Sequence, residues 1–242
     1  MRVQLFATCL VDSLFPEVGE AVVEVLTRAG VEVWFPSEQT CCGQPALNAG
    51  SRAEARTLAI HTLEALAAED VVVVPSGSCT QMIRHHYPEL LAGHPEELER
   101  ARRLADRTFE FSEFLVDQLL VADFEASLPL VIAYHPSCHL LRGLGVDRQP
   151  LRLLEGIAGA SIERLSPECC GFGGLFSVEL PEISREMLER TLERIRSSEV
   201  ELVAGCDVSC LMQIEGGLRR AGSPVRCSHL AQLLAGRSAG LK

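Results

Sequence analysis

The chain has 242 residues, a formal net charge of −11 at pH 7 and 47% hydrophobic residues. This length allows one large domain or two of about 120 residues, and the composition excludes a disordered, fibrous or linker protein. The acidic balance argues against nucleic acid as a partner, and no apolar run approaches the roughly 18 residues of a membrane span. Because the first residues lack the apolar segment of a signal peptide, we expect a cytoplasmic protein whose thiols stay reduced.

In the first half of the chain, strands and helices are predicted to alternate. Short apolar runs place strands at residues 3–7, 31–35 and 71–74. Apolar residues at helical spacing place helices at residues 20–29, 51–68, 95–107 and 112–122. Ser51 and Glu54 have the spacing of a capping box at the start of the second helix. The last two helices have no obvious counterpart later in the chain.

The same order of elements restarts after Leu128-Pro129. Strands are predicted at residues 130–134, 161–165 and 201–204, and helices at 181–197 and 211–221. We place the boundary near residue 126, which gives a first module at 1–125, with a helical extension, and a second at 126–242. Strand–helix alternation predicts an α/β fold in which parallel sheets are flanked by helices.

The cysteines repeat one pattern in both halves. A lone cysteine precedes a Cys-Cys-Gly triplet with 31 or 30 residues between, and another cysteine follows the pair after 36 or 39 residues. The first set is Cys9, Cys41, Cys42 and Cys79, and the second is Cys138, Cys169, Cys170 and Cys210. Such a near-repeat indicates a duplicated unit. Because each cysteine follows a predicted strand, and ligands gather beyond the carboxyl ends of parallel strands, each set is expected to converge on a site.

Four thiolates in one site suit a soft metal. Adjacent cysteines cannot readily bond to each other, but both can reach a multi-iron centre, so we favour an iron–sulfur cluster over buried thiols or disulfides. Zinc is the alternative for four cysteines. Gly43 and Gly171 follow the two pairs and allow the backbone to approach closely, so that amide N–H groups can point at cluster sulfurs.

Other thiols and histidines have weaker signals. Cys206 is either an additional ligand or a small buried thiol, and Cys227 is expected to pack at the opening of a last helix. His135 and His139 flank Cys138 and can donate to a sulfur or move a proton, although a structural role is favoured. No dinucleotide fingerprint or phosphate-loop lysine is present, so the chain is expected to carry electrons and not to accept hydride.

These motifs resemble the cysteine-rich CCG-domain family, which includes the cysteine-rich subunit of heterodisulfide reductase and the glycolate oxidase iron–sulfur subunit. The resemblance is strongest to its lactate utilisation members and covers essentially the whole chain. It is carried by residues 8–12, 41–46, 75–79, 137–139, 169–178 and 210–212. The resemblance implies a subunit of a complex that oxidises L-lactate to pyruvate through iron–sulfur centres. It also implies two partners, a ferredoxin-like iron–sulfur subunit and a third small subunit.

The chain departs from the reductase pattern at two positions. That pattern ends each module with Cys-x-x-Cys, whereas the first of these positions is Ser76 in one half and Asp207 in the other. Each site thus offers four family cysteines, which favours a 4Fe–4S cluster or a metal ion over the non-cubane cluster of the reductase. The resemblance also gives zinc more weight in the second set, because similar modules can be structural. Two other hypotheses stay open: electrons from glycolate or from a thiol–disulfide pair, and a zinc-stabilised docking subunit without redox chemistry.

Overall fold

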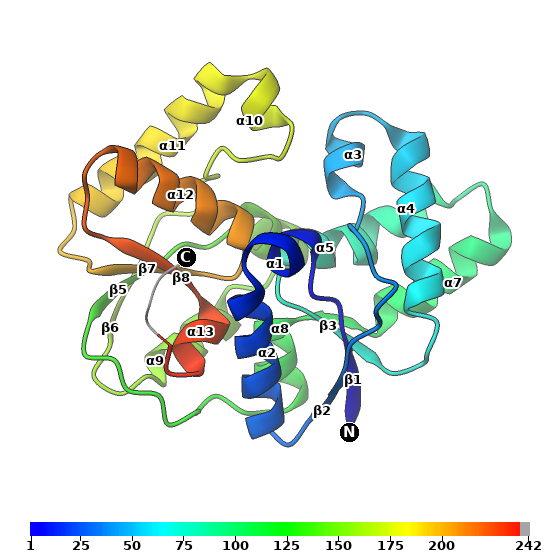
Figure 1. Cartoon of the computed structure of the whole chain (residues 1–242), viewed down its shortest axis with the longest axis horizontal. Helices are drawn as coiled ribbons and strands as arrows, with labels where there is room; N and C mark the ends of the chain where they lie inside the picture. Colours follow the sequence, from blue (N-terminus) through cyan, green and yellow to red (C-terminus); the bar gives the residue numbers. More distant parts are fainter. Residues whose placement is uncertain (238–242) are drawn as a thin grey trace.

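A computed structural model describes residues 1–237 of the chain. It contains two parallel four-stranded sheets with the same strand order, β2-β1-β3-β4 and β6-β5-β7-β8 (Figure 1). The strands of the first sheet are β1 (Arg2–Leu5), β2 (Glu32–Trp34), β3 (Val71–Val74) and β4 (Thr108–Glu110). Those of the second are β5 (Val131–Tyr134), β6 (Ser161–Arg164), β7 (Leu202–Gly205) and β8 (Arg226–His229). The predicted α/β class with two tandem parallel-sheet modules is therefore confirmed.

Helices connect the strands and cover the sheets (Figure 1). In the first half they are α1 (Cys9–Leu14), α2 (Pro16–Arg28), α3 (Gln44–Asn48), α4 (Arg52–Ala65), α5 (Gly77–Gln81), η1 (Met82–His86), α6 (Tyr87–Leu90), α7 (Pro95–Asp106), α8 (Phe111–Glu113) and η2 (Phe114–Gln118). In the second half they are η3 (His139–Gly143), α9 (Arg148–Glu155), α10 (Phe176–Glu179), α11 (Pro181–Arg196), α12 (Val208–Arg220) and α13 (Leu230–Leu234). The three η segments are π-helical turns.

The central strands form where the sequence is most apolar. Val72, Val73 and Val74 of β3 are fully buried, and β3 pairs with β1 on one side and β4 on the other. In the second sheet β7 takes the same central place between β5 and β8. A strand buried on both faces needs such a continuous hydrophobic run, which is why these two strands were predicted.

Two of the four edge strands, β4 and β8, were not predicted, because neither contains an apolar run. Cys227 lies in β8 and is fully buried, so its expected place in a helix was wrong. Each edge strand is followed by a short helix, α8 after β4 and α13 after β8. The segment 112–122 therefore has a counterpart in the second half after all, and its helical part ends at Gln118, before the predicted end.

Helix starts also differ from the sequence pattern in detail. Ser51 precedes α4, but its side chain makes no capping hydrogen bond, so the expected capping box is wrong. Capping boxes instead begin α8, where Glu110 is the cap, and α13, where His229 is the cap. Helix α12 begins at Val208, so Cys210 lies in its first turn and not before it.

One hydrophobic cluster joins the two halves. A single cluster of buried residues contains Val18, Ala21 and Val25 of α2 together with Leu230 and Leu234 of α13. Helix α13, the last described helix, lies against α2 of the first half (Figure 1). Arg28 Nη1 donates a hydrogen bond of 3.0 Å to the Leu234 carbonyl. No helix among residues 1–237 is long and apolar enough to cross a membrane.

Candidate metal centre

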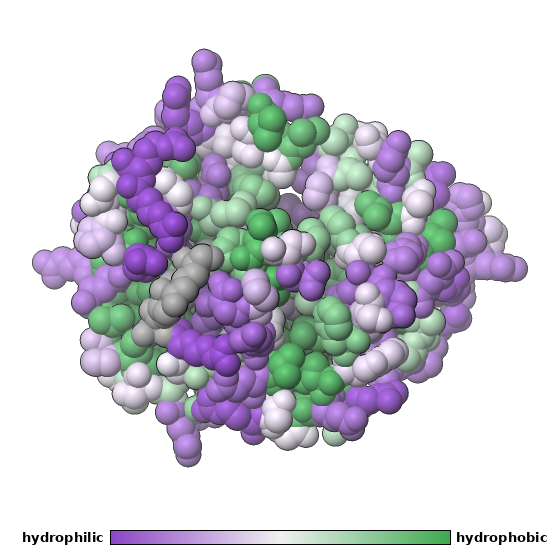
Figure 2. Space-filling view, in the orientation of Figure 1, coloured by the Kyte–Doolittle hydropathy of each residue, from purple (hydrophilic) through white to green (hydrophobic). Residues whose placement is uncertain are grey.

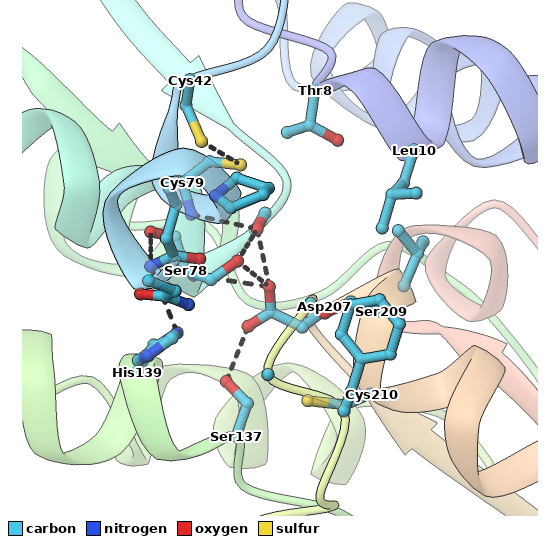
Figure 3. Close-up of a pocket in the computed structure, with 18 of the residues that line it drawn as sticks. Thr8, Leu10, Cys42, Ser78, Cys79, Ser137, His139, Asp207, Ser209 and Cys210 are labelled. Carbon is cyan, nitrogen blue, oxygen red and sulfur yellow. Dashed lines mark hydrogen bonds between the residues drawn. The ribbon is translucent and has the colours of Figure 1, made fainter. Parts of the chain in front are cut away.

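All eight cysteines of the repeated pattern line one cavity of about 210 Å³. They follow strands β1, β2 and β3 in the first half and β5, β6 and β7 in the second, as the parallel topology predicts. Figure 2 shows a recess between the α10–α11 region and α3 in the molecular surface, and Figure 3 shows the side chains that line the cavity. The two sets were expected at separate sites, but they face a common space.

The first set forms a chain of interacting sulfurs. Cys42 Sγ lies 3.3 Å from Cys79 Sγ (Figure 3). The thiols of Cys42 and Cys9 donate to the Cys41 sulfur, which lowers the Cys41 pKa to about 3 and raises the pKa of both donors. The Gly43 amide also donates to the Cys41 sulfur at 3.5 Å.

Backbone geometry presents these cysteines to the cavity. Gly43 has φ 88°, and a Cβ there would lie 3.2 Å from the Ala55 carbonyl oxygen, so glycine is the residue that fits. Thr8, just before Cys9, has φ 72° and ψ 149°, a region that residues other than glycine rarely adopt. Such a backbone costs roughly 1–3 kcal/mol and is typical of functional sites.

The second set repeats this arrangement. The thiols of Cys138 and Cys170 donate to the Cys169 sulfur and lower the Cys169 pKa to about 2. The Cys210 pKa is lowered to about 7, first by the Cys170 thiol and further by His135. Gly171 has φ 83°, and a Cβ there would clash with the Ser184 carbonyl oxygen. Its amide donates to Cys169 as that of Gly43 does to Cys41.

The two positions that depart from the reductase pattern are bonded to each other. Ser76 Oγ donates to Asp207 Oδ1 at 2.6 Å (Figure 3). Ser78 Oγ also donates to Oδ1, at 3.0 Å, and Ser137 Oγ donates to Oδ2 at 2.7 Å. Asp207 is 2% exposed and lies in the cavity lining. Its carboxylate accepts hydrogen bonds from three serines and so links the two halves. The sequence showed that both family cysteines were replaced, but it did not show that the replacements meet.

The flanking histidines have different positions. His139 lines the cavity, with Nδ1 3.5 Å from Gln44 Nε2 (Figure 3). His135 is 1% exposed, and its ring nitrogen lies with the sulfurs of Cys170 and Cys210 in a group whose ligand atoms are all within 4.8 Å of one another.

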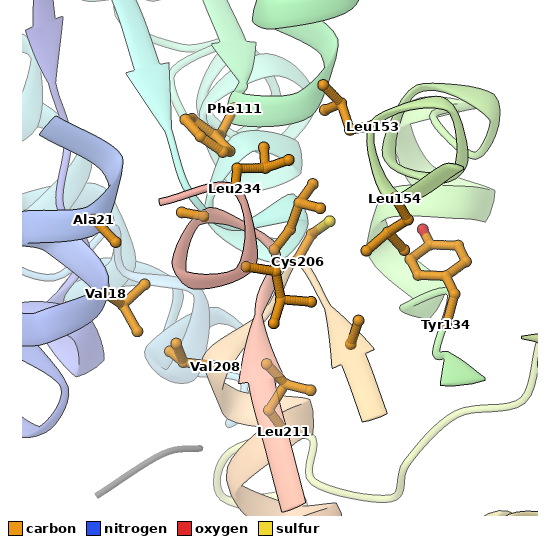
Figure 4. Close-up of a cluster of buried hydrophobic side chains, with 14 of the residues drawn as sticks. Val18, Ala21, Phe111, Tyr134, Leu153, Leu154, Cys206, Val208, Leu211 and Leu234 are labelled. Atoms are coloured by element: carbon orange, nitrogen blue, oxygen red, sulfur yellow. The ribbon is translucent and has the colours of Figure 1, made fainter. Parts of the chain in front are cut away.

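The remaining cysteines lie outside the cavity lining. Cys206 is 1% exposed and packs in the hydrophobic core among residues such as Leu154 and Leu211 (Figure 4). Burial raises the Cys206 pKa well above that of an ordinary thiol. Cys227 is buried in β8. The structure therefore places Cys206, the additional ligand considered from the sequence, apart from the two sets.

The donor set fits a thiolate-bound metal or cluster. Each set brings four sulfurs together, one of them already acidic, and a backbone amide points at that sulfur. Thiolates are the ligands that zinc and iron–sulfur clusters share. The one carboxylate in the lining, Asp207, is occupied by serine hydroxyls. Hard cations, which prefer oxygen ligands, do not match this chemistry.

A protein-family comparison matches the same repeat. The family described as "Cysteine-rich domain", CCG, matches residues 3–84 and again residues 132–215. The chain therefore belongs to the cysteine-rich CCG-domain family and contains the domain twice.

Within this family the chain is similar to proteins named Lactate utilization protein A. It is 43% identical over 237 residues to Lactate utilization protein A 2 of Bacillus cereus (strain 03BB102), which is 97% of this chain and 98% of the relative. It is 45% identical over 236 residues to Lactate utilization protein A of Geobacillus thermodenitrificans (strain NG80-2), with the same coverage of 97% and 98%. The resemblance inferred from the cysteine motifs is confirmed.

Solved structures are much less similar. A substrate-binding protein of a sugar ABC transport system from Bordetella parapertussis 12822 gives a TM-score of 0.31 at 12% identity, covering 95% of this chain and 68% of that one. A likeness at this level carries no argument about function.

Proposed function

We propose that this chain is the iron–sulfur electron-transfer subunit of a complex that oxidises L-lactate to pyruvate. The observation that carries the proposal is the gathering of eight cysteines around one cavity, in two sets of interacting thiols. Similarity to proteins named Lactate utilization protein A supports lactate as the substrate. Each set would hold a 4Fe–4S cluster, which accepts and releases single electrons when bound.

The first centre would be held by Cys9, Cys41, Cys42 and Cys79, and the second by Cys138, Cys169, Cys170 and Cys210. Around them, the chain supplies burial and fixed dipoles. Cys42 and Cys170 are each 2% exposed, which keeps water from these sulfurs. The amides of Gly43 and Gly171 donate to sulfur in each set and so favour the reduced, more negative state.

We further propose the partners, the compartment and the module boundary of this chain. A ferredoxin-like iron–sulfur subunit and a third small subunit would be the partners, so that this chain passes electrons and is not a complete enzyme alone. All ten cysteines are free, as is usual in the cytoplasm, where we place the protein. The boundary between the modules is proposed at 125/126, in the connection between η2 and β5.

Zinc in the second set is a second candidate, favoured by one observation. The ligand atoms of His135, Cys170 and Cys210 lie within 4.8 Å of one another, a spacing that suits a single tetrahedral ion. A chain with zinc in place of clusters would be a docking subunit.

Metal analysis separates these candidates. The protein would be purified without oxygen, and iron, acid-labile sulfide and zinc would be quantified per chain, with electron paramagnetic resonance on the dithionite-reduced sample. Iron and sulfide near about four or about eight per chain are expected for one or two 4Fe–4S clusters. Zinc without sulfide would overturn the electron-transfer role.

The substrate needs a separate test. Turnover of the assembled complex would be measured on L-lactate and on glycolate, and with a thiol–disulfide pair. Lactate is expected to be the preferred electron source, and a clear preference for either of the others would reject it while leaving the iron–sulfur role intact.

A further inference from the structure

The two cysteine sets differ at the position three residues before the first cysteine of each set. Phe6 lies three residues before Cys9, and His135 lies three residues before Cys138. The Phe6 amide donates to the Val73 carbonyl in β3 at 3.0 Å, and the His135 amide donates to the Ala204 carbonyl in β7 at 2.8 Å. Since β3 and β7 have the same place in their sheets, Phe6 and His135 occupy equivalent backbone positions.

Both side chains are buried in the same region as cysteines of their own set. Phe6 is fully buried and belongs to the apolar cluster that contains Cys42 and Cys79. His135 is 1% exposed and has the equivalent neighbours, Cys170 and Cys210, with ligand atoms within 4.8 Å. The same position is thus an apolar wall in the first set and a nitrogen donor in the second.

His135 has no other use in the described structure. Apart from the neighbouring thiols, neither Nδ1 nor Nε2 has a hydrogen-bond partner among residues 1–237. A neutral imidazole carries one N–H donor and one lone pair, and leaving them unsatisfied in a dry interior is costly. A metal bound to the lone pair would satisfy it. The lone pair also lies beside two thiols, which are themselves metal ligands.

We propose that His135 is a nitrogen ligand of the second centre, with Cys170 and Cys210 and in place of one of the four cysteines named above, whereas the first centre is bound by sulfur alone. The inference rests on the proposed metal centres and adds to them a chemical difference between the two. Imidazole is neutral where thiolate is negative, so the added electron of the reduced state meets less repulsion. The second centre is therefore expected to have the higher reduction potential.

The test uses two substitutions in the full-length protein, purified without oxygen. His135→Phe gives the second half the residue that the first half already has, so the change is sterically matched by the chain itself. His139→Gln is the control, because His139 lines the same cavity and is already bonded to Gln44. Circular dichroism confirms folding of each variant.

Nitrogen coordination would be read by pulsed electron paramagnetic resonance of the reduced sample, and by X-ray absorption at the metal edge if zinc is bound. We expect the strong ¹⁴N coupling of a directly bound imidazole, distinct from the weak couplings of the Gly43 and Gly171 amides, or a mixed sulfur–nitrogen shell, in the unsubstituted protein and in His139→Gln. This signal should be lost in His135→Phe. The potential of one centre should shift to lower values in His135→Phe, or that centre should be lost, while the other keeps its potential.

If His135→Phe does not fold, His135→Cys provides the test, since a thiolate at this position should keep the metal, remove the nitrogen signal and lower the potential. A second centre that shows sulfur alone, or a nitrogen signal that survives loss of His135, would overturn the inference and leave the metal centres standing. Absence of metal from the unsubstituted protein would overturn the proposed centres and this inference with them.

Discussion

The first and second halves place their cysteines on equivalent elements, yet the residues around those cysteines differ. Phe6 corresponds to His135, and Ser76 corresponds to Asp207, each pair at the same place after the same strand. Ser76 caps α5 by accepting from the Cys79 amide, whereas Asp207 makes no cap and reaches across to the other half. The repeated backbone therefore fixes where the cysteines lie, and the adjacent positions differ in charge, in donor atoms and in the contacts that they make between the halves.

The largest expected effect comes from removing one cysteine of either pair. Cys42→Ala should abolish the absorption of the first centre and leave the second, and Cys170→Ala should do the reverse, because each sulfur interacts only within its own set. Iron, sulfide and visible absorption per chain measure the effect. Retention of both signals in either variant would reject the ligand assignment, and loss of both would mean that the sets are not independent.

The contact between α5 and η3 tests how closely the halves must approach. A Cβ on Gly77 would lie 2.7 Å from Leu140 Cβ and 2.9 Å from Leu140 Cα, across the two halves. Gly77→Ala should therefore reduce the free energy of unfolding by about 3 kcal/mol, the upper range for overpacking. Urea unfolding measures the change.

The matched control is a glycine with free space. Gly216 is exposed in α12, and a Cβ there would meet nothing within 4 Å. Gly216→Ala should stabilise the protein by roughly 0.5–1 kcal/mol through helix propensity alone. Equal effects of the two substitutions would show that the α5–η3 contact is not tight.

Asp207 tests the polar link between the halves. Asp207→Ala leaves three serine hydroxyls without their acceptor and should destabilise the protein by about 2 kcal/mol. Asp207→Asn keeps one acceptor oxygen and should cost about half as much. Thermal and urea unfolding of both variants give the comparison. An Asp207→Ala variant as stable as the unsubstituted protein would mean that the free-energy cost of burying the carboxylate equals the stabilisation from its hydrogen bonds.

The capping residues of the two edge-strand helices should give opposite pH dependences. Burial raises the Glu110 pKa to about 8 and lowers the His229 pKa to about 4. Glu110 therefore stabilises the fold most at low pH and loses this effect as pH rises from about 4.5 to 8. His229 stabilises it above about pH 6.5 and loses the effect as pH falls to about 4.

Substitution by glutamine should remove each dependence separately. The stability of Glu110→Gln, relative to the unsubstituted protein, should rise by roughly 1 kcal/mol per pH unit between pH 5 and 8. That of His229→Gln should rise as pH falls from about 6.5 towards 4. Unfolding free energies at several pH values measure both slopes. Parallel curves for the variant and the unsubstituted protein would show that the buried group does not titrate in this range.

The sequence was sufficient for the central strands and for the convergence of each cysteine set. Val71–Val74 is an apolar run, and parallel strands bring their carboxyl ends together wherever they lie in the chain. The edge strands β4 and β8 were not predicted, because Thr108–Glu110 and Arg226–His229 are stabilised by pairing to a neighbouring strand and not by their own pattern. The shared cavity was not predicted from the sequence either. The placement of one sheet against the other depends on the common core and on Asp207, which no local pattern encodes.

The packing of α13 on α2 has a consequence for synthesis on the ribosome. Arg28 and its partner Leu234 are 206 residues apart, so the apolar face of α2 emerges long before the helix that covers it. Domains generally fold in the order in which they leave the ribosome, but this first half waits for the last described helix to complete its core. The nascent first half therefore exposes both hydrophobic surface and four reduced cysteines for most of translation, the interval in which a chaperone would protect the chain most.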